Sequence, residues 1–426
     1  MCRFIVYKGA EPIQLSHLVT RPRHSITNQA FESKLRLPSS RPMNADGFGI
    51  GWYDPVLSEP TVHASGAAAH SHPHATGVES TPSSRPISPP LQLPIVPEGS
   101  SAAGPSTLRT GTPPALSPGG AVLPDPVEVA AQVADEARSA EVAALRERER
   151  EIESERPCVF KSISPAWSNA NLTRLAEKIR SPLVFAHVRA STMSGAPSED
   201  NCHPWVFDRL MWMHNGEINA FPKIKRALQA SLSEELFLYP SGYTDSEWAF
   251  MVFLSMLKDP HARSFTHREL SDAMMKTIKF INQLSKEAGI TGPSLMNFVV
   301  SDGHTVVATR YISSRTSEAS SLFFSSGTSF DEYEPAAGLY RMTKADKRER
   351  IIMIASEPLT FERADWVEVK TNMMVVITPK MNLLQIPIID DYWVAPQDPA
   401  SHSRSPDFAI KLGFGHGFAY DAALVA

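Results

Sequence analysis

A cysteine follows the first methionine of this 426-residue chain, and that position could make it a catalytic nucleophile. A small penultimate side chain permits removal of Met1, which would make Cys2 the N-terminal residue. Cys2 would then carry both a thiol and a free α-amine with a reference pKa of about 8, a base able to take the thiol proton. The alternative is an ordinary half-buried side chain in a first strand. The choice depends on whether the partners of such a nucleophile occur elsewhere.

Polar residues at the ends of apolar stretches supply candidates for these partners. Arg189 could clamp a substrate carboxylate through two hydrogen bonds, although a strand often ends in a charge. Asn215 and Gly216 offer a side-chain amide and a backbone N–H, the donors of an oxyanion hole, although Asn-Gly is also a turn sequence. Asp245 is the first residue of a predicted helix. It could bind an ammonium group there, or it could simply stabilise the helix by interacting with the helix dipole. Their joint occurrence with Cys2 favours an amide-cleaving site.

Composition excludes several other classes of protein. The formal net charge of −5 provides no basic footprint, so we expect no nucleic-acid partner. Three cysteines without a CxxC pair indicate free thiols in a reducing compartment. The sequence has no secretory signal pattern and no run of 18 apolar residues, which predicts a cytoplasmic protein without a membrane span.

A long segment of different composition interrupts the chain at residues 58–157. Pro, Ser, Ala, Gly and Thr dominate residues 58–125, which predicts disorder because too little apolar surface can be buried. Residues 127–155 are rich in Ala, Glu and Arg and favour an exposed charged helix, with only a thin apolar stripe for a partner. Three alternating histidines in the segment favour a solvated tract over a metal site: His70, His72 and His74.

The rest of the sequence predicts one α+β domain. Residues 2–8 alternate as a strand, and two helices are expected, from Asp245 to about residue 257 and over about 268–288. Strands, two central helices and then more strands fit a sandwich better than alternating βαβ winding. We expect one domain over residues 2–395, interrupted by the insertion, and a loose tail over 396–426. The later strands are expected at 295–301, 304–312, 321–326, 351–356, 373–379 and 382–388.

Together these motifs resemble the class II glutamine amidotransferase domain, whose fold is the four-layered αββα sandwich of N-terminal-nucleophile hydrolases. The resemblance lies in Cys2 and in AHVRAST (186–192), NCHP (201–204), HNGE (214–217) and TDSE (244–247). A narrower resemblance is to the amidotransferase subunits of fungal glutathione-degradation complexes. It lies in MCRF (1–4), TRP (20–22), RPMNADGFG (41–49), PAW (165–167) and ASEPLTFER (355–363). It covers about residues 2–57 and 158–395.

The resemblance implies a role for each matching residue and implies neither a metal nor a cofactor. The implied roles are Cys2 as nucleophile, Asn215 and Gly216 as oxyanion hole, Arg189 with Thr192 on the substrate α-carboxylate, and Asp245 on the α-ammonium. A histidine near the site corresponds to His203, whose role stays open. The chain departs from the sugar-phosphate amidotransferases at Ala190, where they carry tryptophan. We expect no isomerase or phosphoribosyltransferase domain after the sandwich.

The resemblance therefore implies a γ-glutamyl thioester mechanism in which water releases glutamate. Glutamine and glutathione share the glutamyl end, so the residues alone do not separate them. The narrower resemblance favours glutathione, with cysteinylglycine as the leaving group, and a peptidase-like partner subunit. Two alternatives stay open, a glutaminase or ammonia-donor subunit and a non-catalytic scaffold.

Overall fold

The computed structural model describes residues 2–32, 44–54, 126–190, 197–360, 362–395, 398 and 403–408. The chain divides into two compact units, Met1–Leu57 with Ala144–Ala426, and Ser58–Ala143. In the smaller unit the described residues belong to helix α3 (Pro126–Glu155), which continues into the larger one. This helix agrees with the charged helix expected at 127–155. The low-complexity residues 58–125, with their three histidines, lie outside the described residues.

The first sheet of the larger unit contains the N-terminal strand and is antiparallel throughout. Its seven strands among the described residues are, in spatial order, β13 (Val367–Glu368), β9 (Phe323–Gly327), β12 (Ile351–Ala355), β1 (Arg3–Gln14), β4 (Arg180–Val188), β2 (Phe48–Tyr53) and β3 (Cys158–Ser162). Strand β1 lies between β12 and β4, with Ile5 opposite both Ala355 and Ala186. The chain start is therefore held on both sides.

The second sheet is also antiparallel. Its six strands among the described residues are, in spatial order, β15 (Leu383–Pro387), β14 (Met373–Ile377), β8 (Val306–Arg310), β7 (Leu295–Ser301), β6 (Leu210–Glu217) and β5 (Trp205–Phe207). Strand β6 carries the predicted oxyanion-hole residues at its end. Strands β10 (Ser329–Glu334) and β11 (Leu339–Thr343) form a separate hairpin.

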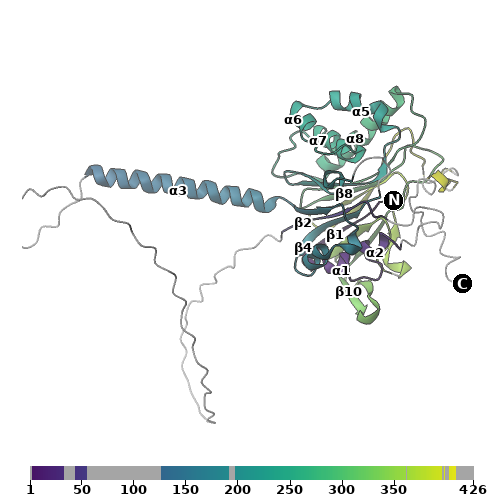
Figure 1. Ribbon diagram of the computed structural model, residues 1–426, viewed down its shortest axis with the longest axis horizontal. Coiled ribbons are helices and arrows are strands. Elements are labelled where there is room, and N and C mark those ends of the chain that lie inside the picture. Colours follow the sequence, from purple (N-terminus) through teal and green to yellow (C-terminus); the bar gives the residue numbers. More distant parts are fainter. Residues whose placement is uncertain are drawn as a thin grey trace, which may run out of the picture. The chain divides into compact units, whose positions relative to one another are not determined.

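Helices cover the outer face of each sheet (Figure 1). The second sheet packs against α5 (Phe221–Ala230), α6 (Glu234–Leu238), α7 (Asp245–Ser255) and α8 (His267–Glu287), and the first against α1 (Ser16–Val19), α2 (Ile26–Gln29) and α4 (Ala170–Ala176). Short 3₁₀ helices lie at Ala166–Ser168, Glu199–Asn201, Pro335–Ala337 and Arg363–Asp365. The layer order helix, sheet, sheet, helix confirms the predicted αββα sandwich.

Side-chain alternation along two strands shows how the site is placed. In β1, Phe4 and Val6 point into the core between the sheets, while Ile5 and Tyr7 pack under the helices of the first sheet. In β6, Met211 and Met213 enter the same inter-sheet core, and Trp212 packs under α7. Because side chains alternate with period two, Cys2 and Asn215 belong to the two facing inner surfaces. The sequence pattern thus brings the predicted nucleophile and amide to the facing surfaces of the two sheets.

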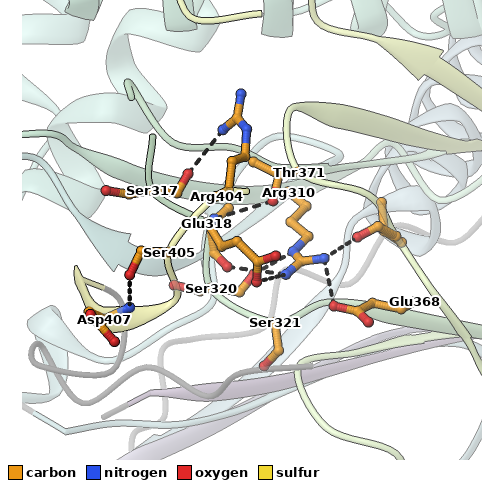
Figure 2. Close-up of polar contacts among 12 residues, drawn as sticks. Arg310, Ser317, Glu318, Ser320, Ser321, Glu368, Thr371, Arg404, Ser405 and Asp407 are labelled. Atoms are coloured by element: carbon orange, nitrogen blue, oxygen red, sulfur yellow. Dashed lines mark hydrogen bonds and ion pairs between the residues drawn. The ribbon is translucent and has the colours of Figure 1, made fainter. Parts of the chain in front are cut away.

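The C-terminal residues 403–408 differ from the expected loose tail. The Arg404 guanidinium donates to the carbonyl oxygens of Ser314 (2.9 Å), Ser317 (3.0 Å) and Tyr392 (3.0 Å). Figure 2 shows Arg404 and Ser405 beside Ser317, with which Ser405 forms a parallel bridge. Phe408 packs against a small apolar cluster of Leu295, Ile312 and Ala319. One guanidinium can donate hydrogen bonds to several carbonyl oxygens at once, and composition alone does not predict such contacts.

Candidate active site

Cys2 lies at the start of β1, beside the end of β4. Its half-buried thiol faces the carbonyl oxygen of Ala190, with an Sγ–O distance of 3.6 Å. The register pairs Arg3 with Val188, so the next residues along, Cys2 and Arg189, are neighbours across the two strands. The structure therefore brings together two of the residues predicted from widely separated motifs.

A glycine turn fixes the backbone at Arg189. The Arg189 N–H donates to Gly47 O (2.8 Å), and the Asp46 N–H donates to Arg189 O (3.3 Å). The Arg189 guanidinium, which is mostly buried, donates to Asp46 O (3.4 Å). Gly47 has a φ of +111°, and a Cβ there would lie 2.7 Å from the Cys202 sulfur. Only glycine fits this turn without strain, so the turn fixes Arg189 beside Cys2.

A buried charge network anchors the first residues of β1. The Arg3 guanidinium donates to Cys2 O (3.0 Å) and to Glu357 Oε2 (3.2 Å), and both ionic side chains are almost fully buried. The other Glu357 oxygen lies 2.7 Å from His24 Nε2. Burying charged groups is unfavourable unless each is paired, so this network fixes the chain start in one position. Sequence reasoning did not identify Glu357 or His24 as part of the site.

Asn215 reaches across the gap between the sheets toward the N-terminal strand. Its amide lies 3.0 Å from the Ser356 hydroxyl oxygen, which also accepts from the Phe4 N–H at 3.1 Å. Ser356 follows β12 and is paired to β1, because its N–H donates to Phe4 O (3.0 Å). Asn215 is therefore connected through one hydroxyl to the residue two places after Cys2.

Gly216 occupies a position that no side chain could share. A Cβ there would lie 2.0 Å from Leu295 O and 2.5 Å from His214 Nε2. The His214 ring donates from Nε2 to Leu295 O (3.0 Å), and its Nδ1 lies 2.8 Å from Ser246 Oγ. Burial lowers the pKa of His214, which favours the neutral ring. The packing accounts for glycine at this position whatever its chemical role.

Asp245 is the first residue of α7, and its carboxylate is tied to the end of β6. It accepts the Ile218 N–H at 2.7 Å, and its other oxygen lies 3.2 Å from the Ser246 hydroxyl oxygen. The helix itself is capped by Thr244, whose side chain accepts the Glu247 N–H. Burial, and then the nearby Asp245 carboxylate, raise the pKa of Glu217. Asp245 therefore lies close to the Asn215–Glu217 strand end, and Glu217, which the sequence analysis quotes in the HNGE motif without a role, is its neighbour.

His203 is packed in the interior. Its ring stacks on His187 at a centroid distance of 3.8 Å and meets Trp205 edge-on at 4.2 Å, and neither ring nitrogen has a hydrogen-bond partner. Burial lowers its pKa well below the usual value, so the ring stays neutral. His187 donates from Nε2 to His214 O (3.2 Å) and links the two sheets. Thr192, the other predicted substrate contact, lies outside the described residues.

Glu247 gives a pH dependence that can be tested. Its buried carboxylate accepts the backbone N–H groups of Ser241 (3.1 Å) and Gly242 (2.9 Å), and burial raises its pKa from 4.5 to about 6. The pKa of Glu247 is higher in the folded than in the unfolded state, so the protonated carboxyl stabilises the fold. This stabilisation is present below about pH 4.5 and is lost as the pH rises through 6. When the pH is lowered from 7 to 4, we expect the unfolding free energy of the wild type to increase by about 2 kcal/mol relative to that of Glu247→Gln. Urea unfolding at both pH values measures this difference, and equal pH dependence in the two proteins would contradict it.

Among the described residues, no group of three or more His, Cys, Asp or Glu side chains is arranged to hold a metal ion. In the same part of the chain, no helix has the length and apolar character needed to cross a membrane.

Comparison with known proteins gives consistent matches. Residues 153–385 match the sequence profile of the family described as glutamine amidotransferases class-II. A Saccharomyces cerevisiae protein named probable glutamine amidotransferase DUG3 is 39% identical over 423 residues, covering 97% of this chain and 90% of that protein. A putative glutamine amidotransferase of Haemophilus influenzae is 29% identical over 136 residues, covering 30% of this chain and 39% of that protein. A solved structure, a glutamine aminotransferase class-II domain protein from Silicibacter pomeroyi, aligns with a TM-score of 0.46 and 19% identity, covering 91% of this chain and 100% of that one.

Proposed function

This chain belongs to the class II glutamine amidotransferases, and from that premise we propose that it hydrolyses the γ-glutamyl bond of glutathione through a thioester on Cys2. The observation that carries the proposal is the position of Cys2, whose thiol lies next to the Arg189 segment at the start of the strand that Asn215 contacts, through Ser356, from the other sheet. In the proposed reaction, nucleophile, cation and amide donor act on one substrate. Such an arrangement suits acyl transfer from an amino-acid amide.

The first half of the reaction forms the thioester. With Met1 removed, the α-amine of Cys2 takes the thiol proton, and the sulfur attacks the γ-carbonyl carbon. Asn215 and the Gly216 N–H stabilise the oxyanion, and the leaving amine receives the proton held on the α-ammonium. Water then attacks the thioester, glutamate leaves, and the thiol is restored.

Substrate recognition is assigned to the glutamyl end. Arg189 pairs with the α-carboxylate, with Thr192 as a helper, and Asp245 pairs with the α-ammonium. The backbone hydrogen bonds between Arg189 and the Gly47 turn support this role, because they fix the position of the residue. These contacts do not distinguish glutamine from glutathione. The resemblance of the ASEPLTFER and RPMNADGFG segments to glutathione-degradation subunits favours glutathione and a peptidase-like partner.

The test measures glutamate release from glutathione and from glutamine at equal concentrations. Full-length protein whose mass confirms loss of Met1 is assayed alone and with cell extract that supplies partners. The same extract with Cys2→Ala protein corrects for other γ-glutamyl hydrolases. Cleavage of glutathione that requires Cys2 is the expected result. Absence of turnover with either substrate, despite a free Cys2 and added extract, would overturn the proposal.

The same assay separates the alternatives. Turnover of glutamine without cleavage of glutathione would select a glutaminase or an ammonia-donor subunit, because both leave glutathione intact. An intact Met1 on the mature chain would favour a scaffold, since the α-amine of Cys2 would then be blocked.

A further inference from the structure

The Ser356 hydroxyl has a fixed position between the N-terminal strand and Asn215. Ser356 is fully buried, its N–H donates to Phe4 O (3.0 Å), and its carbonyl accepts the Ser321 hydroxyl (2.8 Å). Its own Oγ accepts the Phe4 N–H at 3.1 Å and lies 3.0 Å from the Asn215 amide. These backbone contacts thus fix the position of the Ser356 hydroxyl, independently of how the Asn215 amide is oriented.

A second set of contacts holds the segment that contacts Ser356, and Figure 2 shows Arg310, Ser320, Ser321 and Glu368 of this set. The buried Arg310 guanidinium donates to Ser320 O (3.0 Å) and to Glu368 Oε1 (2.8 Å). Asn297 also donates to Ser320 O, at 3.0 Å. Ser320 precedes Ser321, whose hydroxyl contacts Ser356, so the support extends from the partly buried Arg310–Glu368 ion pair to Ser356.

The orientation of the Asn215 amide decides what it can do. In the structure Nδ2 faces Ser356 Oγ, and Oδ1 is buried without a hydrogen-bond partner. An unpartnered buried acceptor costs free energy, and a carbonyl oxygen repels a developing oxyanion. Rotating the amide by 180° about its Cβ–Cγ bond exchanges the two ends at nearly the same heavy-atom positions. Ser356 would then donate to Oδ1 while still accepting from Phe4, which pairs the hydroxyl, the Phe4 N–H and Oδ1 and leaves the NH₂ group for a substrate oxygen.

We propose that Ser356 is the positioning residue of the oxyanion hole, and that its hydroxyl donates to Asn215 Oδ1 and so turns the Asn215 NH₂ group toward the reacting carbonyl. The proposal rests on the proposed function, in which Asn215 supplies that hole. Its geometric basis is that Cys2, Phe4 and Asn215 belong to the facing inner surfaces of the two sheets. The Ser356 hydroxyl thus holds the Asn215 amide against the N-terminal strand, two residues from the nucleophile.

Ser356→Ala tests this role through turnover. Without the hydroxyl, both amide orientations are available, and the fraction with NH₂ toward the substrate falls. We expect kcat for γ-glutamyl hydrolysis to fall about 10- to 100-fold with KM nearly unchanged, a smaller loss than the ~10²–10³-fold for deleting an oxyanion donor. Ser356→Thr keeps the hydroxyl and should recover most of kcat. Ser325→Ala is the matched control, because it removes another buried serine hydroxyl in the same sheet, on β9, and should leave kcat unchanged.

A double-mutant cycle separates positioning from general support of β1. If Ser356 acts through Asn215, Ser356→Ala should lower kcat much less in an Asn215→Ala background than in the wild type. If it acts instead by holding the Phe4 N–H and hence Cys2, the two losses should multiply. Multiplying losses, a rise in KM alone, or no recovery with Ser356→Thr would each overturn the proposal.

Neutron diffraction from crystals of the deuterium-exchanged protein reads the amide orientation without any turnover. Deuterons on the Asn215 end that faces away from Ser356, and one on Ser356 Oγ directed at Asn215, are the expected result. Deuterons on the end that faces Ser356 would overturn the proposal even in an active enzyme. An inactive wild type with the expected deuterons would instead contradict only the proposed function.

Discussion

Cys2→Ala is expected to abolish glutamate release, with kcat lowered by about 10⁴-fold or more. The thiol is the atom that forms the thioester, and no other group of the proposed site can form that bond. The fold should be unaffected, because the thiol is half-buried and makes one weak contact with Ala190 O at 3.6 Å. We expect the unfolding free energy to change by less than about 1 kcal/mol. Turnover and urea unfolding of the same preparation measure both effects.

The controls concern the other thiols and the covalent intermediate. Cys158→Ala, an exposed position on β3, should retain turnover. The Cys202 thiol is not a competing nucleophile, because burial raises its pKa to about 11 and keeps it protonated near neutral pH. Added hydroxylamine should trap the thioester as γ-glutamyl hydroxamate with wild-type protein and not with Cys2→Ala. Trapped product from Cys2→Ala would assign the nucleophile elsewhere.

The fold could be predicted well wherever a periodic pattern was long. The helix expected to start at Asp245 begins there, and the helix expected at about 268–288 is observed as His267–Glu287, followed by Gly289 with a φ of +66°. The first strand is longer than the expected 2–8, because β1 continues past a register shift to Gln14. The β10–β11 hairpin was not predicted, since its polar residues lack a clear apolar alternation. Local patterns therefore located the elements better than their ends.

The site could be predicted only in part from the sequence. Residues at strand ends, such as Arg189 and Asn215, carry a signal because an apolar run points to them. Ser356 and Glu357 follow an equally apolar run, β12, and are quoted in the family resemblance, yet their roles depend on pairing with a strand more than 350 residues away. His187 looked like one residue of a buried strand and proves to bridge the sheets, with its pKa lowered to about 3 by burial. Long-range partners of this kind become visible only in the folded chain.

Glu357→Ala is expected to lower the unfolding free energy by about 3–5 kcal/mol, because removing one partner leaves buried charge without its counter-ion. Glu357 and Arg3 are 1% and 0% exposed and lie 3.2 Å apart, and the second carboxylate oxygen lies 2.7 Å from His24. Arg3 also donates to the carbonyl of Cys2, so the nucleophile should lose its fixed position and kcat should fall in the protein that remains folded. Urea unfolding followed by tryptophan fluorescence measures the stability loss.

The matched control is Glu177→Ala, which breaks a shorter but exposed ion pair. Glu177 and Arg21 are 2.6 Å apart, with each side chain 38% exposed, so solvent screens them and the expected loss is below about 1 kcal/mol. Glu357→Gln should lie between the two, since the amide oxygen keeps an acceptor for Arg3 but not the charge. Equal losses for Glu357→Ala and Glu177→Ala would mean that burial adds nothing to the Arg3 pair. The start of β1 would then owe its position to backbone pairing with β4 and β12 alone.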